Sequence, residues 1–283
     1  THPAATTVTK DILQAWFASF SHLEAFSQKR YRSGIFQLCK FLSRRDPGTA
    51  QRSDFESFRG QPRTFKAHIF SEEEIGRMLK AARELRSLTS DPLRPWSMEL
   101  VVTLLYTSGL RIGEVVRLKV RDYDLARRSL VISETKFAKS RLVPISTSAQ
   151  RIVEAYLERR RNLGLRCEPD DPLRCCPSNH RPCIGSVQVA LVRMMRHAGL
   201  KPQKGRGPRV HDIRHVFAVH RILQWYREGK DVQALLPRLV TYMGHSGLES
   251  TQWYLSIIPA ILQEAGARFE RFVQIKQSGE VSL

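Results

Sequence analysis

The pattern of apolar positions predicts that the chain begins with two helices and then breaks. In two early stretches apolar residues recur at the spacing of a helix face: Ile12, Leu13, Trp16, Phe17 and Phe20, then Tyr31, Ile35, Leu38 and Leu42. Thr9 is placed to cap the first helix. The following stretch is charged, carries proline and glycine, and has little periodicity. We therefore expect a helical unit over 1–45, a linker over 46–69 and a larger domain over 70–283.

The larger domain is predicted to be mainly α with a small antiparallel β hairpin. Ser71 and Glu74 form a capping box ahead of an apolar stripe, so a helix should begin there. The stretch 96–106 is apolar on nearly all sides and ends at Gly109, which predicts a buried helix. The β-branched runs 129–133 and 142–145 flank a basic segment, which is typical of a hairpin. Further helices are predicted over 149–163, 186–197 and 213–223.

The net charge of the chain limits the kinds of partner that it is expected to bind. The sequence holds 46 Lys and Arg against 27 Asp and Glu, a formal net charge of +19. Such an excess attracts a polyanion through phosphate contacts and release of counterions. No apolar run is long enough to span a membrane, and no signal-peptide pattern is visible at the N-terminus. These features favour a cytoplasmic, nucleoid-associated protein that binds nucleic acid and not a membrane.

Two groups of residues could suggest zinc, and both are disfavoured. Four of the five cysteines lie over 167–183 around His180, but the spacing is not paired Cys-x-x-Cys. Without a secretion signal, we expect them to be reduced thiols. His211 and His215 are four residues apart, yet the glutamate of a zinc hydrolase helix is absent between them. We therefore expect no metal and no cofactor.

A site for an anion is predicted where the stretch 213–223 begins. His211 and Arg214 are three residues apart and should share one face of the first turn. A buried arginine needs an anionic partner, and Asp212 should point elsewhere on the helix, so an outside anion is the natural candidate. A helix N-terminus with an arginine fork and an imidazole suits a phosphate.

Two further motifs, taken together with this site, resemble the motifs of a known protein family. One runs from Thr107 to Leu118 and contains Arg111 and Glu114; the other begins at Gly244-His245 and ends at Trp253-Tyr254. In order and spacing, these motifs and the His211-x-x-Arg214 turn resemble the boxes of the tyrosine recombinase family. That family includes the phage integrases and the bacterial chromosome-dimer recombinases. The resemblance covers roughly residues 70–272.

The resemblance implies transesterification of DNA through a 3′-phosphotyrosyl intermediate, with no metal or ATP. The catalytic residues that it implies are Arg111, Lys136, His211, Arg214, His245 and Tyr254. Tyr254 would be the nucleophile, and Glu114 could hold the Arg111 guanidinium in place. Spacing from the hairpin selects Lys136 over Lys139 as the acid for the leaving oxygen. How acid and base roles divide among His211, His245 and Lys136 stays open.

Further expectations concern DNA and assembly. Family resemblance suggests that 1–45 is the second half of a four-helix DNA clamp, which leads to the hypothesis that two helices are missing. Lys139, Arg141 and Arg159 are expected to contact DNA, although Arg159 could lie on a solvated face. The resemblance also implies duplex DNA as partner and a homotetramer on two DNA sites, with 255–272 docking on a neighbour.

Two features leave alternatives open. The interval from Arg214 to His245 is longer than the family pattern, and Tyr226 or Tyr242 would rival Tyr254 if the register slipped. A type IB topoisomerase and a non-catalytic DNA-binding relative are the competing functions.

Overall fold

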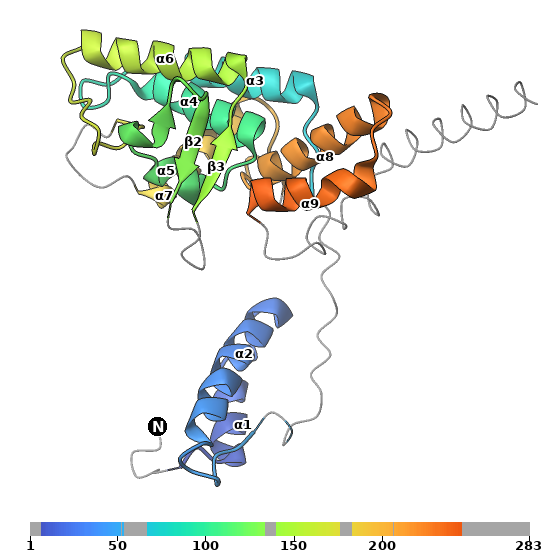
Figure 1. Cartoon of the computed structure of the whole chain (residues 1–283). Coiled ribbons are helices and arrows are strands. Elements are labelled where there is room, and N and C mark those ends of the chain that lie inside the picture. The colour runs from blue at the N-terminus through green and yellow to red at the C-terminus, as the bar shows by residue number, and fades with distance from the viewer. Residues whose placement is uncertain are drawn as a thin grey trace, which may run out of the picture. The chain divides into compact units, whose positions relative to one another are not determined.

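The computed structural model describes residues 7–51, 53, 67–133, 140–175, 183–205 and 207–244. The chain divides into two compact units, Thr1–Lys66 and Ala67–Leu283 (Figure 1). Across the described ranges, no helix is both long and apolar enough to cross a bilayer.

The described part of the first unit contains two helices, α1 over Lys10–Ser19 and α2 over Ala25–Leu42. Their buried contacts come from Leu13, Phe17, Phe20, Cys39 and Ala50. The stripe predicted for α1 is thus largely confirmed, whereas Tyr31 and Leu38 of the α2 stripe are exposed. Thr9 stands at the N-cap as expected, but its side chain makes no capping bond.

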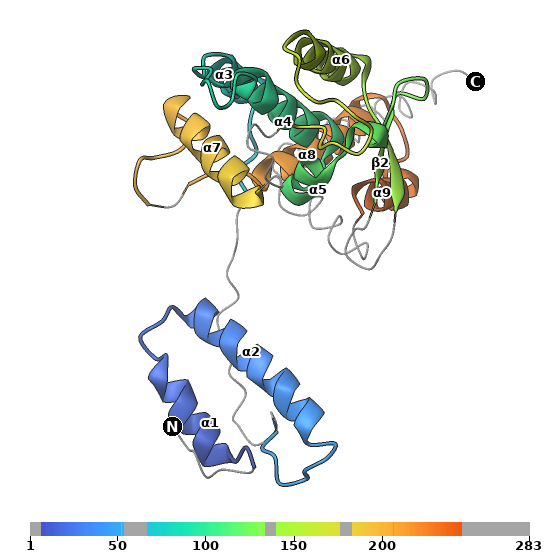
Figure 2. The ribbon, with the colours of Figure 1, turned by 90° about the vertical axis from the view of Figure 1, so that its left-hand side faces the viewer.

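The second unit is helical around one buried helix. The helices among its described residues are α3 (Glu72–Arg83), α4 (Arg94–Ser108), α5 (Ile112–Arg117), α6 (Thr147–Asn162), α7 (Ile184–His197), α8 (Asp212–Arg227) and α9 (Val232–Met243). Helix α4 is packed by α3, α6 and α8 (Figure 1 and Figure 2), and it is buried on nearly all sides, as its composition predicts. The capping box is confirmed too: the Glu74 amide donates to Ser71 Oγ at 3.2 Å, and the Ser71 amide to Glu74 Oε2 at 3.0 Å.

A three-stranded antiparallel sheet packs beside the helices. Its strands are β1 (Tyr123–Asp124), β2 (Ser129–Ile132) and β3 (Arg141–Pro144), in the order β1-β2-β3. The β2–β3 pair is the hairpin that the sequence predicts, with Ile132 opposite Arg141 and Ser129 opposite Pro144. Strand β1 was not predicted, because two residues cannot show an alternating pattern. The fold class, mainly α with a small antiparallel sheet, is confirmed.

The long interval between Arg214 and His245 contains most of α8, which continues to Arg227, and the whole of α9. Helix α9 carries Pro237 within it and ends at Gly244, whose φ is +67°. Its apolar face joins that of α8 in a second cluster, made by Phe217, Ala218, Val219, Ile222, Leu223, Val232, Leu236, Leu239 and Met243. Helix α9 also contacts β3, and this places the sheet next to the C-terminal end of α9.

Candidate active site

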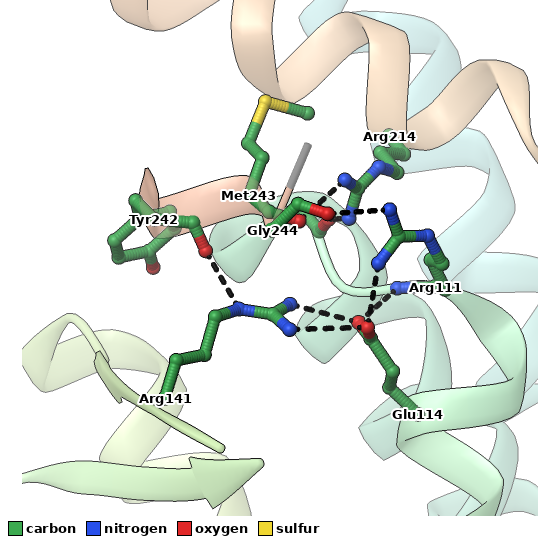
Figure 3. Close-up of polar contacts among 8 residues, drawn as sticks. Arg111, Glu114, Arg141, Arg214, Tyr242, Met243 and Gly244 are labelled. Carbon is green, nitrogen blue, oxygen red and sulfur yellow. Dashed lines mark hydrogen bonds and ion pairs between the residues drawn. The ribbon is translucent and has the colours of Figure 1, made fainter. Parts of the chain in front are cut away.

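The carboxylate of Glu114 lies at the centre of the site and is shared by two arginines (Figure 3). The residue is only 4% exposed. Arg111 donates to it from its backbone amide, 2.9 Å from Oε2, and from Nη1, 2.8 Å from Oε1. Arg141 donates to both oxygens, from Nη1 at 3.1 Å and from Nη2 at 2.9 Å. A two-bond grip of this kind is the strongest geometry between arginine and a carboxylate.

These contacts keep Glu114 charged although it is buried. Burial acts to raise the pKa of the carboxyl, but the hydrogen bonds from Arg141 and Arg111, with the Arg141 charge, outweigh it and lower the pKa to about 2. The site therefore has a fixed negative charge at any ordinary pH. That charge orients both guanidinium groups.

Arg111 extends from the start of α5 to the end of α9. It is the N-cap residue of α5, and the Glu114 amide donates to its carbonyl at 2.9 Å. Its Nη2 donates to the carbonyl of Gly244 at 2.8 Å. Its side chain remains 37% exposed, so the guanidinium is fixed by protein on one side and open to solvent on the other. A guanidinium held in this way can meet an anion from its open side.

Arg214 is held differently from the way the sequence suggests. It is only 2% exposed, and its Nη1 and Nη2 donate to the carbonyls of Gly109 and Met243, both at 2.5 Å. These carbonyls belong to the C-terminal ends of α4 and α9, where backbone oxygens lack partners within the helix and carry partial negative charge. The prediction considered only an acid or an outside anion as partner and overlooked helix ends. Asp212 accepts bonds from Arg209, at 2.9 Å from the amide and 3.0 Å from Nη2.

The structure thus brings together three of the predicted residues. Arg111 and Arg214 bind the carbonyls of two consecutive residues, Gly244 and Met243, and His211 is the N-cap residue of α8, three positions before Arg214. His245 follows Gly244 directly in the sequence. His245, Lys136, Lys139 and Tyr254 lie outside the described residues.

His211 lies in a positively charged setting. Desolvation by the surrounding protein lowers the pKa of its imidazole, and the charges of Arg214 and Arg209 lower it further. The ring of His215 stands perpendicular to it, with centroids 5.0 Å apart, and burial lowers the pKa of His215 to about 4. Both rings are therefore neutral near pH 7, and a neutral imidazole can accept a proton.

The residues expected to contact DNA have different environments. Arg141 points into the protein and its side chain is 11% exposed. Arg159 is exposed, and its guanidinium stacks 4.1 Å from the Trp96 ring centroid. Its neighbour Arg160 is buried and donates to the carbonyls of Pro172 at 2.7 Å and Leu173 at 3.1 Å. The basic run at the end of α6 is thus partly structural.

Tyr242, a rival nucleophile by sequence, is tied into the fold. Its hydroxyl donates to the carbonyl of Pro144 at 3.0 Å, and its ring stacks on Phe217 with centroids 5.4 Å apart. Burial raises its pKa to about 12. A phenol held in this way is poorly suited to attack a phosphate.

Across the described ranges, no three His, Cys, Asp or Glu side chains gather closely enough to hold a metal ion. Cys176 and His180 of the cysteine-rich segment lie outside these ranges.

Comparison with solved structures identifies the fold as that of the tyrosine recombinases. XerH recombinase bound to its difH substrate after cleavage superposes with a TM-score of 0.66 at 18% identity, over 93% of this chain and 73% of that one. The Tn1549 transposon integrase in complex with transposon right end DNA gives 0.64 at 15% identity, over 94% and 86%.

The chain belongs to the phage integrase family, whose model matches residues 68–259. An integrase/recombinase of Sinorhizobium fredii is 38% identical over 213 residues, which are 75% of this chain and 68% of that protein. A second one from this organism is 36% identical over 200 residues, and the chain spans 63% of its length. Tyrosine recombinase XerD of Rhizobium meliloti is 31% identical over 252 residues, 85% of this chain and 73% of XerD.

The role of Arg214 at the two helix ends can be tested by unfolding. Arg214→Met removes both donors, so two buried carbonyls lose a hydrogen bond. Each lost bond should cost about 1–3 kcal/mol of stability. The free energy of unfolding, measured in urea, should fall accordingly. Arg227→Met, at an exposed position in the last turn of the same helix, should change it by about 0.5 kcal/mol or less. Equal effects of the two substitutions would show that the carbonyl contacts do not stabilise the fold.

Proposed function

We propose that this protein is a site-specific recombinase that cuts and rejoins duplex DNA through a 3′-phosphotyrosyl bond to Tyr254. The observation that carries the proposal is the convergence of Arg111 and Arg214 on the carbonyls of Gly244 and Met243. This convergence brings the motif of Arg111, the motif of Arg214 and the start of the motif that ends at Tyr254 to one place. Sequence order alone does not require it.

The chemistry follows from the groups that this place can offer. The Tyr254 oxygen attacks phosphorus, the bond to the 5′ oxygen breaks, and the bond energy is kept in the phosphotyrosine. Arg111 and Arg214 act on the charge of the non-bridging oxygens, where a fixed guanidinium is worth more than a mobile cation. We propose that the neutral imidazole of His211 accepts the tyrosine proton and that His245 donates a hydrogen bond to the phosphate. Lys136 then protonates the leaving 5′ oxygen.

Support for DNA as substrate comes from charge and from the neighbours in structure. The net charge of +19 favours a polyanion, and both superposed recombinases above are complexes with DNA. We propose that the helices of 1–45 clamp the duplex, that 46–69 links them to a catalytic domain over 70–283, and that Lys139 and Arg159 contact the backbone. We further propose a homotetramer on two DNA sites, with 255–272 docking on a neighbouring subunit.

Tyr254→Phe should abolish the covalent adduct with nicked suicide DNA and leave DNA binding nearly unchanged, because only the nucleophilic oxygen is lost. Adduct formation is read on a denaturing gel and binding by fluorescence anisotropy. Tyr242→Phe is the matched control and should still form the adduct. An adduct that persists in Tyr254→Phe would disprove the assignment. If the protein forms the adduct and relaxes supercoiled DNA but gives no recombinant products from a two-site substrate, a type IB topoisomerase is favoured.

The assignment of His211 as proton acceptor predicts a pH dependence. The neutral ring is the active form, so the cleavage rate should be full above the pKa of His211 and fall as the pH drops through it. Because that pKa is lowered, the fall should occur below pH 6.5. His211→Gln should lose this pH dependence and about 10²–10⁴-fold in rate. If the same acidic fall survives in His211→Gln, another group accepts the proton.

A further inference from the structure

The side chain of Arg141 is bound by several protein groups, which a residue that only contacts DNA would not need. It is the first residue of β3, and all three guanidinium nitrogens donate to protein (Figure 3). Nε binds the carbonyl of Tyr242 at 2.8 Å, while Nη1 and Nη2 bind the two oxygens of Glu114 at 3.1 and 2.9 Å. A single side chain therefore joins the sheet, α5 and the end of α9.

The guanidinium also lies directly against Gly244. A Cβ atom added to Gly244 would lie 2.9 Å from Arg141 Nη1, which is closer than real Cβ contacts, and 3.1 Å from Cζ, which is closer than most of them. The carbonyl of this same glycine accepts the bond from Arg111 Nη2. Arg111 and Arg141 thus share Glu114 on one side and enclose Gly244 on the other.

The far end of β3 is fixed to the same segment. Tyr242 accepts a bond from Arg141 with its carbonyl, and donates one from its hydroxyl to Pro144, the last residue of the strand. Strand β3 is therefore attached to the end of α9 at both of its ends. The segment 133–140, which contains Lys136, joins β3 to β2 in the sequence.

Resting on the proposed function, we propose that Arg141 is a positioning residue for DNA cleavage and not a DNA contact. It holds Glu114, and through it Arg111, in register with the end of α9, from which the motif with His245 and Tyr254 begins. It does so from the strand that begins five residues after Lys136.

Arginine is specifically required by this arrangement. The planar fork meets both carboxylate oxygens while Nε reaches a carbonyl on the other side, and a lysine ammonium cannot match this geometry. An apolar residue would leave Glu114 with part of its charge uncompensated in a buried place. Since Arg141 is the main group that lowers the pKa of Glu114, its loss should raise that pKa.

The first test separates cleavage from binding. Arg141→Met should lower the single-turnover cleavage rate at saturating nicked DNA by about 10²-fold, the typical effect of a misplaced catalytic group. Its affinity for DNA and the salt dependence of that affinity should match wild type. A lost phosphate contact would instead weaken binding and reduce the salt slope by about one. Arg127→Met changes an exposed arginine in the turn between β1 and β2; it is the matched control and should leave cleavage unchanged.

The second test uses pH. In Arg141→Met, the cleavage rate should show a second fall at acidic pH, in addition to the one assigned to His211, because Glu114 takes up a proton as the pH drops through its raised pKa. The double variant Arg141→Met with Glu114→Gln should lack this fall, whatever its absolute rate. A merely destabilised protein would not show a pH dependence that a second substitution at Glu114 removes.

Arg141→Lys keeps the test valid if Arg141→Met does not fold. A positioning role predicts slow cleavage with normal affinity for this variant, whereas a phosphate contact tolerates lysine and predicts near-normal cleavage. The proposal is overturned if wild type forms the adduct and the Arg141 variants cleave DNA as fast as wild type. It is also overturned if these variants lose affinity for DNA but keep the wild-type cleavage rate. If wild type and Arg127→Met form no adduct at all, the proposed function itself fails.

Discussion

A buried carboxylate that must be paired organises this site. Glu114 is almost fully enclosed, and an enclosed anion is tolerated only when cations and donors surround it. Here they come from α5, through Arg111, and from β3, through Arg141. Because these elements are distant in sequence, the ionised carboxylate fixes their relative position, and Gly244 is drawn in through its carbonyl.

The second constraint is the chemistry of helix ends. Helices α4 and α9 both end at a glycine with positive φ, Gly109 at +57° and Gly244 at +67°. This conformation ends a helix abruptly, and Arg214 and Arg111 bind carbonyls at or next to these ends. Both glycines are also approached closely, Gly109 by the ring of Phe217 and Gly244 by Arg141, so an added side chain would force these neighbours to move. The two guanidinium groups are thereby held in place by backbone carbonyls.

Much of this fold could be predicted from local patterns, and the failures have two causes. The capping box at Ser71, the buried helix α4 and the β2–β3 hairpin follow from patterns within about fifteen residues. Partners distant in sequence could not be inferred, so the carbonyls that bind Arg214 were missed. The helix over 232–243 was missed for a local reason, because it carries Pro237 within it and an interior proline normally breaks a helix.

The orientation of Arg141 did leave a signal in the sequence. Residues two apart in a strand face the same side, so Arg141 shares its face with Val143, which is fully buried, while Leu142 between them is 51% exposed. An arginine on the buried face of a hairpin indicates a structural partner. The apolar Leu142 obscured this, because reading it as inward would place Arg141 on the solvent side.

The ionisation of Glu114 tests the central claim most directly. Carbon NMR of the folded protein with labelled glutamate carboxyls, titrated from neutral to acidic pH and assigned by Glu114→Gln, reports this one group. If the two arginines hold the carboxylate as described, its signal should stay that of the charged form until near pH 2 or until the protein unfolds. A titration of Glu114 at or above 4.5 in the folded protein would contradict the account.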